Sequence, residues 1–148
     1  MAEAKKPRGI RNNNPFNIDY NTTPWEGLDE PPTDGRFCRF ISPEFGIRAG
    51  CRVLLTYQNK HGLHDVTSIV NRFAPPVEND TWAYINSICK ALGVRKDEPI
   101  KVDNYDTMRK LVDAIIKHEN GYNPYSDAII AKGMAKAGIK PTPKEGTA

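Results

Sequence analysis

Long hydrophobic runs are missing from this sequence. No apolar stretch approaches the roughly 20 residues that a membrane-spanning helix requires, and the charged N-terminus, MAEAKKPR, is not followed by the apolar segment of a secretory signal. We therefore expect no membrane insertion and no signal peptide. Such a protein works in the compartment where it is made, or another route carries it out.

Cysteine is also scarce. Cys38, Cys51 and Cys89 form an odd, scattered set, and their spacing to the three histidines is not that of a zinc site. Reduced, mostly buried thiols are the expectation, and we predict neither a metal nor a cofactor. A catalytic cysteine–histidine pair stays open, although nothing in the local sequence marks one.

The chain also lacks a large excess of positive or negative charge. The 148 residues carry a formal net charge of +3, and lysines and arginines are spread along the chain. A dedicated nucleic-acid binder usually has a denser basic stripe, which argues against nucleic acid as a partner. A mild positive charge also suits an anionic polymer such as a bacterial cell wall. Charge alone does not decide between these partners.

The composition that remains is that of an ordinary globular protein. Hydrophobic residues make up 39% of the chain and charged residues 26%, as in soluble domains generally. The length fits one domain with a core of useful size. We predict a monomer with a single domain over residues 1–148 and flexible ends at about 1–8 and 140–148, where no apolar period is present.

Helix signals dominate the sequence from residue 43 onward. Ser42, the proline that follows it and Gly62 bracket a helix over about 43–60. Further helices are predicted over about 66–73, 80–92 with Trp82 on its buried side, 103–120 with Asp103 as its cap, and 126–137. Residues 11–36 have the composition of a loop, and residues 37–41 alternate like a short strand. These patterns predict a mainly α (α+β) protein with one small β-hairpin.

The helix predicted over 103–120 has an apolar stripe that ends in a carboxylate. Tyr105, Met108, Val112, Ile115 and Glu119 follow one another at steps of three or four residues, so they share one face. A Glu that continues a core-facing stripe near a helix C-terminus is desolvated and lies at the negative end of the helix dipole. Both effects favour a protonated carboxylic acid that can act as a general acid. The same spacing also suits a surface Glu in the last turn.

Several motifs of the first two thirds resemble those of small bacteriophage and prophage virion or lysis proteins. They are RGIRNNNPFNI (residues 8–18), WEG (25–27), FCRF (37–40), PEFGIRA (43–49) and APPVENDT (74–81). Those proteins usually have a glycine where this chain has Phe16, which puts the close backbone approach that a glycine permits in doubt.

The stretch AIIKHENGYNP (residues 114–124) is similar to the catalytic motif of lytic transglycosylases and other lysozyme-like enzymes. The small-residue turn departs from that motif at Asn120, where the family has Ser. In bacterial N-acetylglucosaminidases of the flagellar type, the helix ending in the catalytic Glu precedes the Asn-Asn motif, whereas here it follows that motif. The resemblance therefore implies a lysozyme-like fold in circularly permuted order.

The resemblance implies the following site. Glu119 would protonate the leaving oxygen of a β-1,4 glycosidic bond, and Glu78 is the first candidate for a second carboxylate. Amide and aromatic side chains suited to a glycan are Asn13, Asn14, Asn17, Tyr20, Tyr122 and Tyr125. The same asparagines also commonly cap turns, and the tyrosines could hold a loop against the core.

The resulting expectation is a peptidoglycan-cleaving enzyme of phage or prophage origin. It would act on the bond between N-acetylmuramic acid and N-acetylglucosamine, as a lytic transglycosylase or a lysozyme-type muramidase. It would be located in the virion or the host cytoplasm and reach the periplasm without a signal peptide. Two alternatives stay open: a non-catalytic virion or wall-binding protein, with other virion proteins as partners, and a nucleic-acid packaging factor.

Overall fold

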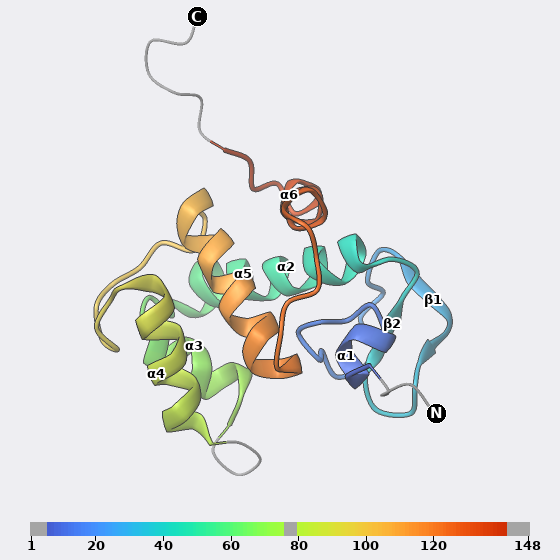
Figure 1. Ribbon diagram of the computed structural model, residues 1–148, viewed down its shortest axis with the longest axis horizontal. Helices are drawn as coiled ribbons and strands as arrows, with labels where there is room; N and C mark the ends of the chain where they lie inside the picture. The colour runs from blue at the N-terminus through green and yellow to red at the C-terminus, as the bar shows by residue number, and fades with distance from the viewer. Residues whose placement is uncertain (1–5, 76–79, 142–148) are drawn as a thin grey trace, which may run out of the picture.

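The computed structural model describes residues 6–75 and 80–141. The elements in chain order are α1 (Arg8–Arg11), β1 (Leu28–Thr33), β2 (Cys38–Phe40), α2 (Pro43–His61), α3 (Val66–Phe73), α4 (Thr81–Leu92), α5 (Tyr105–Asn120) and α6 (Asp127–Lys136) (Figure 1). The expectation of a mainly α protein with a small antiparallel sheet is confirmed. No helix in the described part is both long enough and apolar enough to cross a membrane.

The long helix α2 runs through the middle of the molecule (Figure 1). It starts after Ser42 and ends at Gly62, whose φ of 64° is the left-handed conformation that a glycine adopts at low cost. Helix α6 packs closely against it at Gly133, where a Cβ atom would lie 2.6 Å from the Ile47 side chain. Helix α2 therefore forms the centre on which the other elements assemble.

Side-chain caps begin the next three helices. Asp65 accepts a hydrogen bond from the Ser68 amide at the start of α3, and Asp80 accepts one from Ala83 at the start of α4. Helix α5 is capped by Asn104, whose side chain accepts from the Thr107 amide, and not by Asp103 as predicted. The cap falls one residue later because Asn104 is the last residue with extended backbone before the helix.

The N-terminal region is more ordered than its loop composition predicts. Helix α1 and strand β1 both lie in or at the edge of the stretch predicted as a long loop. Strand β1 pairs antiparallel with β2, with Leu28 opposite Phe40 and Thr33 opposite Cys38. The β1 sequence LDEPPT has no apolar–polar alternation and two prolines, which is why no strand signal was visible.

Two hydrophobic clusters hold the described residues together. The large one joins α2 to α6, and Phe16 is its one fully buried contribution from residues 6–42. The small one consists of Cys38, Phe40 and Ala49. Trp82 is 58% exposed instead of buried, because Tyr84, Ile85 and Ile88 form the inward face of α4 and the Lys96 ammonium lies over the indole ring.

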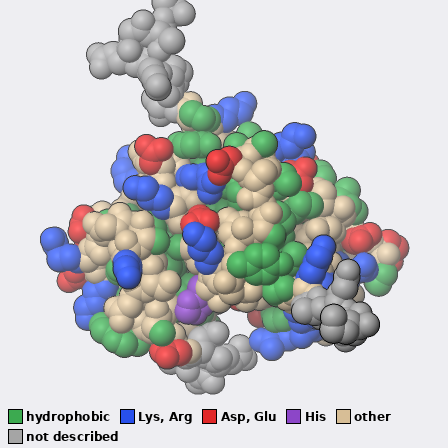
Figure 2. Space-filling model, viewed as in Figure 1, with side chains coloured by type: hydrophobic (Ala, Val, Ile, Leu, Met, Phe, Trp, Pro, Cys, Tyr) green, Lys and Arg blue, Asp and Glu red, His purple; other side chains and the backbone are tan. Residues whose placement is uncertain are grey.

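Charged side chains are mixed on the surface. Basic and acidic groups alternate across the face seen in Figure 2, without a continuous patch of one sign. The predicted flexible ends, 1–8 and 140–148, lie largely outside the described residues.

Candidate functional site

The centre of the candidate site is a hydrogen bond between residues far apart in the chain. Glu119 lies half-buried in the last turn of α5, and its Oε1 accepts a hydrogen bond from Nδ2 of Asn17 at 2.9 Å. The two residues are 102 positions apart. Asn17 adopts a left-handed backbone with φ of 52°, which Asn tolerates better than most residues. The expected meeting of the Glu helix and the Asn-rich loop is therefore present.

The residue after the acid fastens the loop to the helix. The buried Asn120 side chain donates from Nδ2 to the Pro15 carbonyl at 2.9 Å and to the Ile116 carbonyl at 3.0 Å. A serine at this position would be too short to span both contacts, so the departure from the lysozyme-like motif has a structural role here. Gly9 completes the fit, since a Cβ there would lie 2.5 Å from Asn120 Oδ1.

A buried tyrosine faces the acid from α4. Tyr84 is 1% exposed, and burial, followed by the nearby Glu119 carboxylate, raises the pKa of its hydroxyl. That hydroxyl completes no hydrogen bond of ordinary geometry with the described residues. The His118 imidazole stacks on the Tyr84 ring at 3.8 Å between centroids. His118 is exposed and covers the ring of the buried tyrosine.

Glu119 and Asn17 line one cleft of about 790 Å³. Its wall includes the apolar and aromatic residues Phe16, Ile18, Phe37, Val53, Tyr57 and Phe73. Its charged lining residues are Asp19, Arg36, Arg72 and Glu119. A cleft that combines aromatic residues with a few polar side chains is suited to a small-molecule or glycan ligand.

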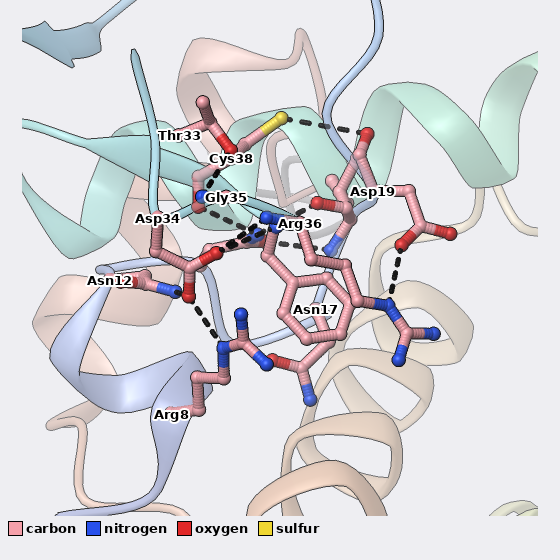
Figure 3. Close-up of polar contacts among 12 residues, drawn as sticks. Arg8, Asn12, Asn17, Asp19, Thr33, Asp34, Gly35, Arg36 and Cys38 are labelled. Atoms are coloured by element: carbon pink, nitrogen blue, oxygen red, sulfur yellow. Dashed lines mark hydrogen bonds and ion pairs between the residues drawn. The ribbon is translucent and has the colours of Figure 1, made fainter. Parts of the chain in front are cut away.

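Polar and charged side chains also hold the loop that carries Arg36 and Phe37, two lining residues of this cleft (Figure 3). Asp34 accepts hydrogen bonds from Arg8, Asn12 and the amides of Arg36 and Phe37. These bonds, that of Arg8 first, hold the pKa of Asp34 well below its usual range. The guanidinium groups of Arg8 and Arg36 both lie 4.7 Å from the centroid of the Phe37 ring. The Phe37 ring, one of the aromatic residues of the cleft wall, thereby contacts two cations.

Two of the predicted substrate contacts form hydrogen bonds within the loop. Asn14 is fully buried, and its side chain bonds the Ile18 carbonyl, the Ile18 amide and the Cys38 carbonyl. Asn13 donates to the Phe40 carbonyl at 3.0 Å and does not line the cleft. Much of the hydrogen-bond capacity of these amides is used inside the loop, and contact of Asn13 or Asn14 with a glycan stays a prediction. Asn17 keeps its place in the cleft.

The predicted tyrosines do not line the cleft either. Tyr20 and Tyr122 are exposed, at 41% and 44%. Tyr125 packs against the large core cluster, and burial, then the neighbouring Tyr122, raises the pKa of its hydroxyl to about 12. Glu78, predicted as a second carboxylate, lies outside the described residues.

Sequence reasoning missed Asp19 and four further residues of the site. Arg36, Arg72 and Tyr57 line the cleft, and Tyr84 lies beneath the acid. Tyr84 is three residues from Thr81 and one from Ile85 on the buried face of α4, so the period marks it as core and not as part of a site. The arginines are not distinguished from other surface arginines by any local pattern.

Outside this cleft, the described residues contain a second hollow and buried cysteines. A second hollow of about 730 Å³ between α5 and α6 contains Arg109 and Asp127, which pair with each other. Burial raises the pKa of Cys38 to about 11 and that of Cys51 to about 12, so both thiols are protonated at neutral pH and unsuited to nucleophilic attack. Within residues 6–75 and 80–141, no three His, Cys, Asp or Glu side chains group together as a metal site would need.

Sequence comparison identifies a phage relative. The chain is 42% identical over 130 residues to Protein P5 of Pseudoalteromonas phage PM2, a match that covers 86% of this chain and 79% of that protein. No family model matches the chain.

Proposed function

We propose that this chain, which belongs to the family of Protein P5 of Pseudoalteromonas phage PM2, cleaves the glycan of bacterial peptidoglycan with Glu119 as its acid. The observation that carries the proposal is the Asn17–Glu119 hydrogen bond inside a cleft. It joins the two motifs whose resemblance implies a lysozyme-like fold in permuted order. The protein would act from the virion or from the host cytoplasm, on the wall in the periplasm.

In this proposal the two carboxylate oxygens of Glu119 have different tasks. Oε1 of Glu119 already accepts the Asn17 amide hydrogen, so the proton for the leaving oxygen belongs on Oε2. Asn17 thereby holds the carboxyl group in one orientation. In a lytic transglycosylase the C6 hydroxyl of the muramoyl unit then attacks C1, and the same Glu takes the proton of that hydroxyl. The product carries a 1,6-anhydro ring, and no second carboxylate is required.

A hydrolase is the second candidate, and Asp19 is the observation that favours it. Asp19 is a second carboxylate among the described lining residues, and its Oδ1 lies 3.4 Å from Nε of Arg36. A second carboxylate in the cleft is suited to activating water in an inverting mechanism. Mass spectrometry of the released muropeptides separates the two: anhydro ends indicate a transglycosylase, and reducing ends that are lost in Asp19→Asn indicate a hydrolase.

The test of the acid itself is Glu119→Gln assayed on purified murein sacculi. We expect release of soluble muropeptides to fall by about 100-fold or more, because positioned acid catalysis contributes on the order of 10²–10⁴. Glu98→Gln is the matched control, since Glu98 pairs with Arg95 away from the cleft. Release at the wild-type rate by Glu119→Gln would overturn the assignment. Binding of sacculi by the wild type without any release would favour a non-catalytic virion or wall-binding protein.

A further inference from the structure

Arg72 is the cation of the cleft that has no acidic partner among the described residues. It lies in the last turn of α3 and lines the same cleft as Glu119. Its Nη2 is 3.4 Å from Nε2 of His61, and its guanidinium carbon is 5.4 Å from the centroid of the Tyr57 ring. Neither neighbour is an anion. In the described part of the chain, no carboxylate comes within ion-pair distance of Arg72.

This arrangement differs from that of the other arginines with known partners. Six described arginines each pair with an Asp or Glu: Arg8, Arg36, Arg39, Arg48, Arg95 and Arg109. Arg11 and Arg52 are exposed without such a pair in the described part, but neither lines the cleft. Arg72 therefore combines two properties: it faces the cleft, and its charge is not used within the described fold.

The charged groups of the cleft lining leave Arg72 without a neighbouring anion. Asp19 pairs with Arg36, and Glu119 bonds the Asn17 amide through Oε1. Both acids of the described lining are thus engaged elsewhere, and neither lies within ion-pair distance of Arg72. A cation in a cleft with no anion beside it attracts an anionic ligand group.

The side chain is also held ready for binding. The Tyr57 ring supports the guanidinium from one side, and His61 Nε2 can accept one N–H when the imidazole is neutral and protonated at Nδ1. A guanidinium that is already oriented loses less conformational freedom on binding. Its remaining N–H groups can form the paired hydrogen bonds that a carboxylate accepts.

We propose that Arg72 binds a free carboxylate of the stem peptide carried by the muramoyl sugar, so that the cleft recognises peptide-bearing glycan and not the sugar chain alone. This inference rests on the proposed function for the identity of the polymer. Arg72 acts in recognition and takes no part in proton transfer.

Binding to sacculi tests the inference without any cleavage. Full-length Glu119→Gln protein is sedimented with native sacculi and with sacculi whose free carboxylates have been converted to amides. We expect Arg72→Gln in that background to weaken binding to native sacculi by about tenfold, the magnitude of one charge-assisted contact, and to leave binding to amidated sacculi unchanged. Arg72→Lys should fall between, because it keeps the charge and loses the paired geometry.

The matched control is Arg95→Gln, whose side chain is 81% exposed and remote from the cleft lining; it should bind native sacculi as the parent does. Equal weakening on both kinds of sacculi, or none on native sacculi, would overturn the inference, as would a failure to bind native sacculi at all. Thermal melting shows whether each variant is folded.

If the wild type releases no muropeptides but binding depends on Arg72 and on carboxylates, the proposed cleavage fails and the recognition stands. If cleavage depends on Glu119 but binding does not depend on Arg72, the proposed cleavage stands and the proposed recognition by Arg72 fails.

Discussion

The helical region from α2 to α6 and the N-terminal region of residues 6–42 are built by different forces. The helical region buries aliphatic side chains from five helices in one cluster. The N-terminal region contributes Phe16 to that cluster and has a second cluster of three fully buried residues, one of which, Ala49, comes from α2. It is held mainly by side-chain amides and carboxylates that bond the backbone, with Asn14 and Asp34 as the centres.

The difference separates the two halves of the candidate site. Glu119 is placed by hydrophobic packing of α5, while its partner Asn17 is placed by the polar network of the loop. Packing depends on volume and temperature, and a hydrogen-bond network depends on each donor having its acceptor. The acid and its partner should therefore fail under different perturbations.

The largest effect should come from Leu111→Ala in α5. Leu111 is fully buried, and truncating such a side chain costs about 2–5 kcal/mol through lost transfer free energy and the cavity left behind. We expect the free energy of unfolding in urea to fall by that amount, with the whole molecule unfolding in one transition. A loss below about 1 kcal/mol would contradict the view that burial dominates this region.

A smaller and more local effect is expected from Asn14→Ala. The change leaves the Ile18 amide and two carbonyls without their side-chain partner, at a cost of about 1–3 kcal/mol. Amide hydrogen exchange should speed up in residues 12–40 more than in α5. Asn86→Ala, on the exposed face of α4, is the control and should change neither quantity. Equal acceleration of hydrogen exchange in residues 12–40 and in α5 would contradict the view that the two regions are held by different forces.

The smallest effect is expected when the pH is lowered. The pKa of Asp34 is lower in the folded protein than in the unfolded chain, so its stabilising contribution is complete above the unfolded value of about 4 and is lost as the pH falls below it. Protection of the N-terminal region should weaken between about pH 4 and pH 2. In Asp34→Asn, that part of the pH dependence should be absent. An unchanged acid profile in the variant would show that Asp34 is not its source.

Helices could be predicted closely from the sequence because their signals are local. The glycine after α2, the Asp65 cap and the prolines after α3 all act within one turn, and the predicted ends of α2 and α3 agree with those observed within a residue. Strand β1 could not be predicted in this way. Its stability comes from pairing with β2 and not from its own residues, two of which are prolines.

The site was predictable in part for the same reason. The stripe that ends at Glu119 is a property of one helix, and the meeting with Asn17 followed from the resemblance to permuted motifs. The burial of Asn14 and the exposure of Tyr20 depend on how the loop folds over Phe40 and Cys38, which no period in the sequence encodes. Arg72 is distinguished by the missing acid around it in the described residues, which is a property of the folded chain alone.

The 102-residue separation between Asn17 and Glu119 also has a consequence for the order of folding. Helix α5 and its contact with the neighbouring α4 close short loops, whereas docking of the Asn17 loop closes a long one, with a larger entropic cost before any contact compensates it. The helices should gain protection first in refolding, and the loop should join them late. Glu119 would thus be in position before its hydrogen-bond partner arrives, and a partly folded chain would hold an acid without a cleft.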